Sequence, residues 1–378
     1  MPDEKLTAYR GGKALRRGWT TGSCAAAASQ AAAVLLLTGI APPEIHLHTP
    51  GGITFCLPVE DAHMSGNAAV CTVRKDAGDD PDITNGVRIT ASVRRIEKGV
   101  TIEGGAGVGR ITRPGLAMPV GEAAINPGPR QQIAYAVHRA AQQNGYGGGF
   151  SVTISVKDGE ALAAQTYNGH LGIVGGISIL GTSGIVEPMS EKALVDTIRL
   201  ELDSLYAQGQ RIAFLCPGNY GADFARDTLG LDLERAVKCS NFIGEAFDHA
   251  AYRGYPEILL VGHAGKLVKM AAGVMNTHSS VADARQEIFT AHAALCGAPR
   301  ETLEGLMAAI SVDACVELLD EVNLRQPVLS RIGREMETRI ALRMKGQARV
   351  EFIMFTGKYG VLAESAGARA LCERLKLQ

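Results

Sequence analysis

Short apolar runs in the second half of the chain are each followed directly by a loop that carries glycine. Such runs occupy residues 211–216, 257–262 and 350–355, and helix-type segments at residues 190–208 and 243–253 alternate with them. This alternation predicts a parallel sheet covered by helices. The carboxyl ends of parallel strands lie at one edge of a sheet, so we expect the loops to converge there on a ligand. The loops lie near Gly181, Gly218, Asn241, Gly262 and Gly357.

The first part of the chain has a different pattern. A long alanine-rich helix is predicted to start with Thr21 or Ser23 as its cap and to end at Gly39. Short strands follow, because alternating β-branched and polar residues are typical of half-buried strands. The predicted strands are residues 45–48, 53–59, 69–74, 87–96, 100–103 and 150–156, with a second helix at residues 129–143.

The pattern changes near Gly172, which sets the expected domain boundary. The predicted fold class is α/β and α+β. An N-terminal α+β domain covers residues 1–172, and a C-terminal α/β domain with a mainly parallel sheet covers residues 173–378. A chain of 378 residues is long enough for two separate cores.

Charge and hydropathy exclude several classes of partner. The formal net charge is −1, so there is no overall basic field to hold nucleic acid or an anionic membrane. We find no apolar run of about 18 residues, the length that a membrane helix needs, and no apolar core of a signal peptide. We therefore expect a cytoplasmic enzyme that acts on a small molecule, and the sequence leaves homo-oligomerisation open.

The eight cysteines form no C-x-x-C pair and have no zinc-finger spacing with histidine. We interpret them as free thiols, mostly buried, and expect no protein-bound metal. Cys24 lies in the first turn of the long helix, where a lowered pKa would suit a nucleophile. Because no neighbouring motif supplies a base, we favour that helix start as an anion site.

Residues 103–109 (EGGAGVG) match the E-x-G-x-G-x-G pattern of common S-adenosylmethionine (SAM) methyltransferases. That loop needs a helix directly after it, so that the helix N-terminus faces the ligand. Pro114 prevents a continuous helix here. We interpret the match as accidental, and leave open a glycine loop that contacts a ligand in another geometry.

Two residues are candidates for proton transfer. Asp80 lies among the crowded carboxylates of residues 75–82, which are expected to raise one another's pKa; a solvated acidic turn is the alternative. His263 lies on a glycine loop and suits acid–base chemistry better than His278. Basic residues beside the loops, among them Arg17 and Arg130, offer a local site for a polyanion.

The chain resembles the cobalt-precorrin-5B (C-1)-methyltransferase family of cobalamin biosynthesis. No single segment decides the resemblance; their number and order do. The matching segments include residues 18–28 (GWTTGSCAAAA), 75–86 (KDAGDDPDITNG), 116–130 (LAMPVGEAAINPGPR), 181–188 (GTSGIVEP), 238–244 (KCSNFIG) and 262–279 (GHAGKLVKMAAGVMNTHS).

The resemblance implies methyl transfer from SAM to C-1 of cobalt-precorrin-5B, giving cobalt-precorrin-6A. The cobalt belongs to the substrate. On this hypothesis SAM binds glycine-loop residues, namely Thr182, Ser183, Gly184, Gly218, Asn219, Tyr220, Gly221, Asn241, Gly262 and Gly265. The N-terminal domain is expected to contribute to tetrapyrrole binding. The residues expected to bind the tetrapyrrole are Arg17, Thr20, Thr21, Gly22, Ser23, Cys24, Arg110, Arg130, Lys266, Lys269, Thr277, His278 and Ser279. Asp80 and His263 are the candidates for proton transfer.

Two other functions fit the glycine loops. One is a nicotinamide-dependent oxidoreductase that acts on a corrinoid intermediate. The other is a non-catalytic corrinoid-binding protein.

Overall fold

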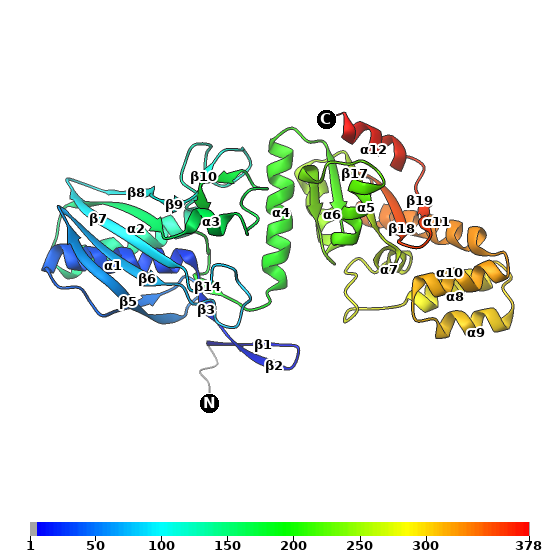
Figure 1. The fold of residues 1–378 in the computed structure, drawn as a ribbon, viewed down its shortest axis with the longest axis horizontal. Helices are drawn as coiled ribbons and strands as arrows, with labels where there is room; N and C mark the ends of the chain where they lie inside the picture. The colour runs from blue at the N-terminus through cyan, green and yellow to red at the C-terminus, as the bar shows by residue number, and fades with distance from the viewer. Residues whose placement is uncertain (1–5, 378) are drawn as a thin grey trace. The chain divides into compact units, whose positions relative to one another are not determined.

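The computed structural model describes residues 6–377 and divides the chain into two compact units, Met1–Glu191 and Lys192–Gln378. Both units combine helices with sheets (Figure 1), so the predicted mixture of α and β structure is confirmed. Each unit has its own hydrophobic core, and each is described separately below.

A six-stranded sheet forms the body of the first unit. Its order is β4-β5-β6-β7-β11-β8, and all neighbours are antiparallel except β11 and β8. The strands are β4 (Glu44–His48), β5 (Thr54–Ser65), β6 (Ala68–Arg74), β7 (Arg88–Ile96), β8 (Val100–Gly104) and β11 (Gly149–Val156). β5 continues beyond the predicted end at residue 59, past a bulge between Val59 and Asp61, because this extension pairs with β6.

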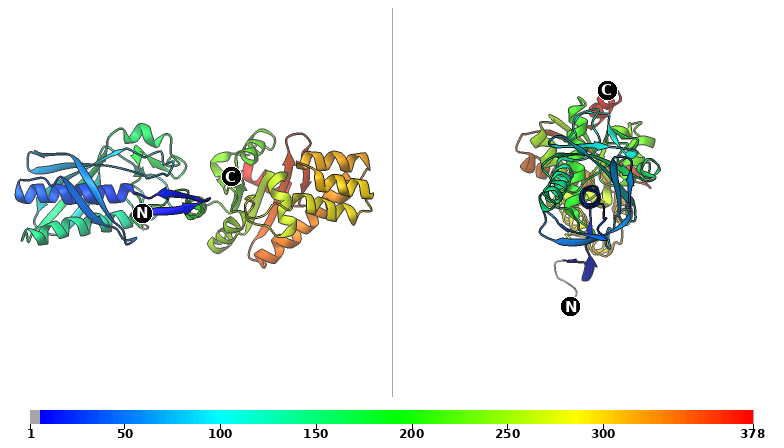
Figure 2. Two further views of the ribbon diagram at one scale, coloured as in Figure 1. Left: turned by 90° about the horizontal axis from the view of Figure 1, so that it is seen from below. Right: turned by 90° about the vertical axis from the view of Figure 1, so that its left-hand side faces the viewer.

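Two helices, α1 (Thr21–Thr38) and α2 (Pro127–Gln143), lie side by side against this sheet (Figure 2). The side-chain oxygen of Thr20 caps α1 by accepting from the N–H of Ser23, so the expected caps Thr21 and Ser23 are corrected to Thr20. α1 ends as predicted at Gly39, whose φ of 77° is left-handed. α1 is long and apolar enough to cross a membrane, but most of it is buried in this core, as in the core helix of a soluble protein.

Short strands and one short helix complete the first unit. Residues beyond the predicted boundary at 172 return to it, because β13 pairs with β9 and β14 pairs with β3. The unit therefore ends at Glu191, later than the pattern of the sequence indicated. These elements are β1 (Thr7–Arg10), β2 (Lys13–Arg16), β3 (Gly18–Trp19), β9 (Gly107–Val108), β10 (Arg110–Ile111), α3 (Gly159–Ala163), β12 (Ile173–Val174), β13 (Gly176–Ile177) and β14 (Ile185–Val186).

The second unit contains a five-stranded sheet in the order β16-β15-β17-β18-β19. The first four strands are parallel, and β19 is antiparallel to β18. The strands are β15 (Ile212–Cys216), β16 (Ala236–Lys238), β17 (Glu257–His263), β18 (Arg349–Thr356) and β19 (Gly360–Glu364).

Helices cover both faces of this sheet. α5 and α12 pack with Phe214 and Val261 on one face, whereas α4, α6 and α11 pack with Leu215 and Leu260 on the other. Helix α5, which follows β15, thus lies on one face of the sheet, and helix α6, which precedes β17, lies on the opposite face. The strand order therefore reverses between β15 and β17. The helices are α4 (Glu191–Ala207), α5 (Asn219–Asp227), α6 (Ile243–Arg253), α7 (Ala264–Leu267), α8 (Arg285–Ala294), α9 (Arg300–Ala308), α10 (Val312–Glu321), α11 (Arg325–Met344) and α12 (Ala368–Lys376), with 3-10 turns at Leu233–Arg235 and Val268–Ala272.

Candidate functional site

The carboxyl edge of the parallel sheet brings four loops together in the second unit. β15 leads into Gly218, β16 into Asn241, β17 into Gly265, and β18 into the turn at Gly357. In open α/β sheets, ligands bind beyond this edge where the strand order reverses. The point of reversal lies between β15 and β17, beside Gly218 and His263. We call residues 217–220, 239–242 and 263–266 the switch-point loops.

Gly218 and Lys266 face each other across these loops. Gly218 has φ 102° and ψ 180°, a backbone conformation that side chains strongly disfavour. A β-carbon built on Gly218 would lie 3.5 Å from the Lys266 ammonium nitrogen. That nitrogen donates to the Ser240 carbonyl at 3.3 Å, and Lys238 donates to the side-chain oxygen of Asn219 at 3.3 Å. Burial lowers the pKa of Lys266, so its charge is poorly solvated and suits an anionic ligand group.

His263 ends β17 with a fixed tautomer. Its Nδ1 accepts from the Gly265 N–H at 3.1 Å, so the neutral ring carries its proton on Nε2. The ring packs edge-on against Phe355, and the ring of Tyr220 lies 6.1 Å away, centroid to centroid. Burial lowers the pKa of His263, although the charge of Asp313 opposes the shift. His263 is therefore neutral near pH 7 and offers a hydrogen-bond donor.

Asp313, in the first turn of α10, is a further polar group of this region. Its Oδ1 atom is buried and has no hydrogen-bond partner among the described residues. A buried carboxylate oxygen without a partner costs free energy, and such an atom in a native protein calls for a donor. The sequence analysis missed Asp313, because nothing in the local sequence links α10 to His263.

Two of the predicted cofactor glycines are required by packing instead. A β-carbon on Gly262 would lie 2.3 Å from Leu267 and 2.7 Å from Pro217, and one on Gly221 would lie 2.7 Å from the Val261 carbonyl. Both residues are buried. Their small size lets α5 and the segment after β17 approach the sheet, which explains them without a ligand.

Lys269 and Thr277 form hydrogen bonds that hold the segment after α7 in place. The Lys269 ammonium group is buried and donates to the carbonyls of Thr277 and Ala282 at 3.2 and 2.9 Å. The Thr277 N–H donates to the Asn241 carbonyl at 2.9 Å. These bonds give Lys269 and Thr277 structural roles, so the structure does not favour their expected contact with the substrate. His278 and Ser279, which follow, are exposed.

Other segments of the chain pack against the first turn of α1 and form hydrogen bonds with it. The Gly22 N–H donates to the Leu180 carbonyl at 3.0 Å, and the Ser23 hydroxyl donates to the Gly184 carbonyl at 2.8 Å. Burial raises the pKa of the Cys24 thiol, which makes it a poor nucleophile. These contacts bury the helix start, so the structure gives the expected anion site no support. The buried residues concerned are Thr20, Thr21, Gly22, Ser23 and Cys24.

The loop at residues 181–184 belongs to the first unit, which corrects its expected place at the edge of the parallel sheet. A β-carbon on Gly181 would lie 2.3 Å from the Thr20 hydroxyl oxygen, and the Gln132 amide donates to the Gly181 carbonyl at 2.9 Å. Thr182 lies beside Gly128 on α2, the Gly184 carbonyl accepts from Ser23 on α1, and the Ser183 carbonyl accepts from the Gly51 N–H. The apolar run before them forms short pairings in the first unit instead of a strand of the parallel sheet.

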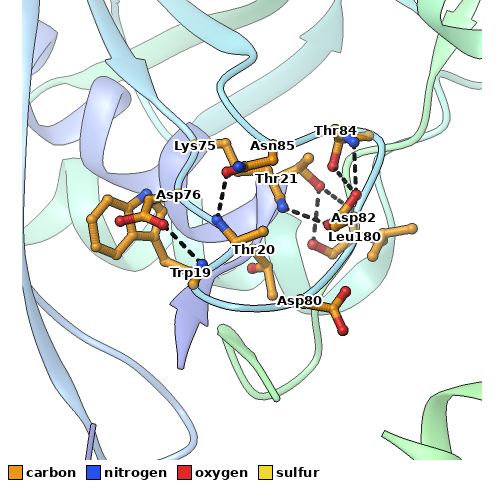
Figure 3. A network of polar contacts seen from close by, with 12 residues as sticks. Trp19, Thr20, Thr21, Lys75, Asp76, Asp80, Asp82, Thr84, Asn85 and Leu180 are labelled. Carbon is orange, nitrogen blue, oxygen red and sulfur yellow. Dashed lines mark hydrogen bonds and ion pairs between the residues drawn. The ribbon is translucent and has the colours of Figure 1, made fainter. Parts of the chain in front are cut away.

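The acidic segment after β6 is a tightly bonded loop (Figure 3). Lys75 is buried and donates to Asp82 at 2.6 Å. Burial opposes ionisation of Asp82, but Lys75 and the donors of Thr84 hold its pKa below the usual value. A hydrogen bond from Arg16 lowers the pKa of Asp76. The expected mutual raising of carboxyl pKa values is therefore corrected for both residues, because each has its own donors.

Asp80 and His263 fall in different units. The Asp80 Oδ1 accepts from the Met189 N–H at 2.9 Å, within the first unit, whereas His263 lies in the second. The structure therefore gives no support for treating them as one catalytic pair. Asp80 is only half-buried.

The predicted arginines are tied within the first unit. Arg17 pairs with Glu187 at 3.6 Å, and Arg110 pairs with Glu103 at 3.1 Å. The Arg130 guanidinium donates to two backbone carbonyls at 2.9 and 3.0 Å.

The segment that matches the common SAM loop forms no such loop. β8 is followed by β9 and β10, and the next helix, α2, begins only at Pro127, so no helix follows the loop directly, as Pro114 predicted. A β-carbon on Gly107 would lie 2.0 Å from the Val156 carbonyl oxygen, and one on Gly105 would lie 2.3 Å from the Ser155 hydroxyl. Gly107 thus allows the backbone of β11 to approach closely, and Gly105 makes room for the Ser155 side chain.

Comparison with known proteins decides the family. The family model described as CbiD matches residues 8–188, and the model described as CbiD, C-terminal domain, matches residues 276–366. The chain belongs to the CbiD family. It is 50% identical over 347 residues to a cobalt-precorrin-5B C(1)-methyltransferase of Ruminiclostridium cellulolyticum, covering 92% of this chain and 90% of that protein.

Other CbiD relatives are also similar over most of their length. A cobalt-precorrin-5B C(1)-methyltransferase of Alkaliphilus metalliredigens is 43% identical over 366 residues, or 97% of this chain and 96% of the relative. The crystal structure of a cobalamin biosynthesis protein (cbiD) from Archaeoglobus fulgidus is 30% identical, with a TM-score of 0.41, and covers 75% of this chain and 88% of that one.

This CbiD chain also buries a carboxyl that the sequence analysis overlooked. Glu201 lies on α4 beside Ile198 and Leu202 and is 8% exposed. Burial raises its pKa to about 7, against the opposing effect of the Lys238 N–H and charge. Helical spacing from Ile198 was the available signal, since residues three and four apart share a face.

Replacing Glu201 by Gln should stabilise the second unit at high pH. The folded pKa of about 7 lies above the unfolded value of about 4.3, so the protonated form is favoured on folding. The free energy of unfolding is therefore highest below the unfolded pKa and falls as the pH rises through the folded pKa, by up to roughly 4 kcal/mol. Calorimetric unfolding should show Glu201→Gln above wild type at pH 8 and close to it at pH 4. An equal difference at both pH values would contradict this origin.

Proposed function

We propose that this chain is a SAM-dependent methyltransferase that methylates C-1 of cobalt-precorrin-5B and gives cobalt-precorrin-6A. The observation that carries the proposal is its similarity, over nearly the full length of both chains, to relatives named for that activity. The names of these relatives favour neither a nicotinamide-dependent oxidoreductase nor a non-catalytic corrinoid-binding protein. The partners are then small molecules and the location is the cytoplasm.

The switch-point loops are the proposed SAM site. Gly218 leaves the backbone uncovered beside Lys266, whose ammonium group suits the carboxylate of the cofactor. The unpartnered carboxylate oxygen of Asp313 suits its ammonium group. Asn219 and the exposed ring of Tyr220 offer an amide and a stacking surface to the adenosine. Bound SAM supplies an electrophilic methyl group on a sulfonium, so the main task of these residues is orientation.

The substrate is a flat ring with several carboxylate side chains, and arginine is the residue best suited to bind carboxylates. Arg17, Arg110 and Arg130 remain our candidates for this role, together with exposed His278 and Ser279. Each arginine already has partners in the chain, so the substrate would compete for or share its donors. The buried residues of the α1 start, Lys269 and Thr277 are no longer part of this proposal.

His263 is proposed as a hydrogen-bond donor that orients a ligand. Because Nδ1 already accepts from Gly265, Nε2 carries the proton and has no free lone pair with which to act as a base. Asp80 keeps Oδ2 available after Oδ1 accepts from Met189, so it remains the candidate that accepts a proton as the ring π-system readjusts.

Transfer of an isotope-labelled methyl group tests the function directly. The purified protein is incubated with cobalt-precorrin-5B and SAM that carries a deuterated methyl group, and the macrocycle is analysed by mass spectrometry. We expect one labelled methyl group at C-1. Binding of the macrocycle without label transfer would support the corrinoid-binding alternative instead. Consumption of a nicotinamide cofactor in place of SAM would support the oxidoreductase.

Replacing Lys266 by Met should weaken SAM binding by about 10- to 100-fold, which corresponds to a lost charge-assisted hydrogen bond of 1.5–3 kcal/mol. Lys266→Met keeps the length of the side chain and removes its charge. Lys376→Met is the matched control, because Lys376 lies on α12 and pairs with Glu373 away from the switch-point loops. Equilibrium dialysis with labelled SAM gives the affinities. If both variants bind SAM like wild type, Lys266 has no part in the site.

A further inference from the structure

The hairpin of β4 and β5 places three metal-ligating side chains on its exposed face. Along β4 the side chains alternate, so that Ile45 and Leu47 point into the core and Glu44 and His46 point outward. On β5, Cys56 is the cross-strand partner of His46 and points outward as well. Strand pairing therefore brings together residues that are ten positions apart in the sequence.

The three groups already contact one another. His46 Nε2 lies 3.0 Å from Glu44 Oε1, and the Cys56 thiol is hydrogen-bonded to the same carboxylate. One ligand atom from each residue lies within 4.8 Å of the other two. In a tetrahedral zinc site, bond lengths of about 2.0–2.3 Å set the ligand atoms roughly 3.5 Å apart. Small side-chain rotations close that difference.

A thiol distinguishes this cluster from ordinary surface ion pairs. All eight cysteines lie in the described part of the chain, and Cys56 is the one classed as exposed. His63 and Asp61, also on β5, form an exposed pair at 3.5 Å but have no thiol beside them. Sulfur and imidazole ligands favour zinc-like transition metals over calcium or magnesium, which prefer oxygen.

We propose that Glu44, His46 and Cys56 form a binding site for a divalent transition-metal ion of the Zn²⁺ and Co²⁺ type. Three protein ligands leave a fourth tetrahedral position for water or another ligand. The rigid antiparallel pair fixes the two strands, so binding orders only the side chains. The site is separate from the switch-point loops of the second unit, and it is independent of the cobalt that the proposed substrate carries.

Titration of the reduced full-length protein with Co²⁺ tests the site spectroscopically. Tetrahedral cobalt bound to a thiolate gives intense visible d–d bands and a thiolate-to-metal charge-transfer band. We expect both to saturate at one equivalent and to disappear when Zn²⁺ is added. Absence of the charge-transfer band in the wild-type protein with excess Co²⁺ overturns the proposal.

Single substitutions assign the ligands. Cys56→Ala should abolish the charge-transfer band. His46→Asn and Glu44→Gln should each weaken Co²⁺ binding by more than the roughly 10- to 100-fold that is typical of losing an outer partner. His63→Asn is the matched control and should bind like wild type. All four positions are exposed, and circular dichroism checks the fold of each variant. Persistence of the band in Cys56→Ala, or unchanged affinity in His46→Asn, overturns the assignment.

Discussion

Replacing Gly78 by Ala should destabilise the first unit by roughly 3 to 4 kcal/mol, combining about 1–2 kcal/mol of left-handed strain with up to about 3 kcal/mol of overpacking. Gly78 has φ 66°, and a β-carbon there would lie 2.1 Å from the Arg16 carbonyl oxygen. The same carbonyl accepts from the Asp79 N–H at 2.9 Å. Because the contact is with backbone, the acidic loop and the end of β2 must move apart to admit the methyl group.

Gly66→Ala is the matched control for this prediction. Gly66 has φ 59°, and a β-carbon there meets nothing within 4 Å. Only the left-handed strain remains, so the expected cost is about 1–2 kcal/mol. Trp19, the only tryptophan, donates to the Arg74 carbonyl beside the acidic loop, and its fluorescence in urea reports unfolding of this unit. Equal losses for Gly66→Ala and Gly78→Ala would show that close approach does not matter.

Replacing Asp82 by Asn should cost about 3–5 kcal/mol, as expected when one partner of a buried ion pair is removed. The Lys75 side chain is 2% exposed and pairs with Asp82 at 2.6 Å. Asparagine still accepts from Thr84, whose N–H and hydroxyl both donate to Asp82 Oδ1, but it leaves the ammonium group without a counter-charge. The pKa of Asp82 is lowered, so the wild-type pair stabilises the fold at neutral pH and loses this effect as the pH falls through that pKa.

The double variant Lys75→Met, Asp82→Asn should recover most of this loss, since replacing both charges of a buried pair is often nearly neutral. Glu103→Ala removes an exposed partner of Arg110 in the same unit and should cost less than about 1 kcal/mol. Urea unfolding followed by Trp19 fluorescence measures all three variants. A double variant no more stable than Asp82→Asn would mean that Thr84 and the loop backbone, and not the charge, carry the effect.

Local patterns in the sequence were sufficient to predict most elements. The predicted helix at residues 243–253 coincides with α6 (Ile243–Arg253), and the apolar run at residues 211–216 is β15 almost without change. Pro114 correctly excluded a helix after residues 103–109, because a missing N–H and a fixed φ act locally. Helix and strand periods depend on neighbouring residues alone, which is why these predictions succeed.

Pairing between distant segments could not be predicted. Gly181 follows an apolar run like the other glycine loops, but it lies against Thr20 at the start of α1 and not at the edge of the parallel sheet. This pairing also extends the first unit to Glu191 and covers the expected anion site. The contacts are set by shape across more than a hundred and fifty residues of sequence, as in the bond from Leu180 N–H to Thr21 at a separation of 159.

Part of the candidate site could be predicted for the same reason that the parallel sheet could. Gly218, Asn219, Asn241 and Gly265 all follow parallel strands, and topology alone brings their loops to one edge. The roles of the other candidate residues depend on their burial, which the sequence does not show. Lys269 carries a charge that suggests a ligand, yet its ammonium group is buried and bonded to two carbonyls.

Photochemical cross-linking of SAM to the full-length protein tests the proposed cofactor site most directly. The protein is irradiated with radiolabelled SAM, with excess S-adenosylhomocysteine as competitor in a parallel sample, and the labelled peptides are identified by mass spectrometry. We predict competitor-sensitive label in residues 217–220 or 263–266, at the switch-point loops. Competitor-sensitive label confined to the first unit, residues 1–191, would contradict the assignment of SAM to the parallel sheet.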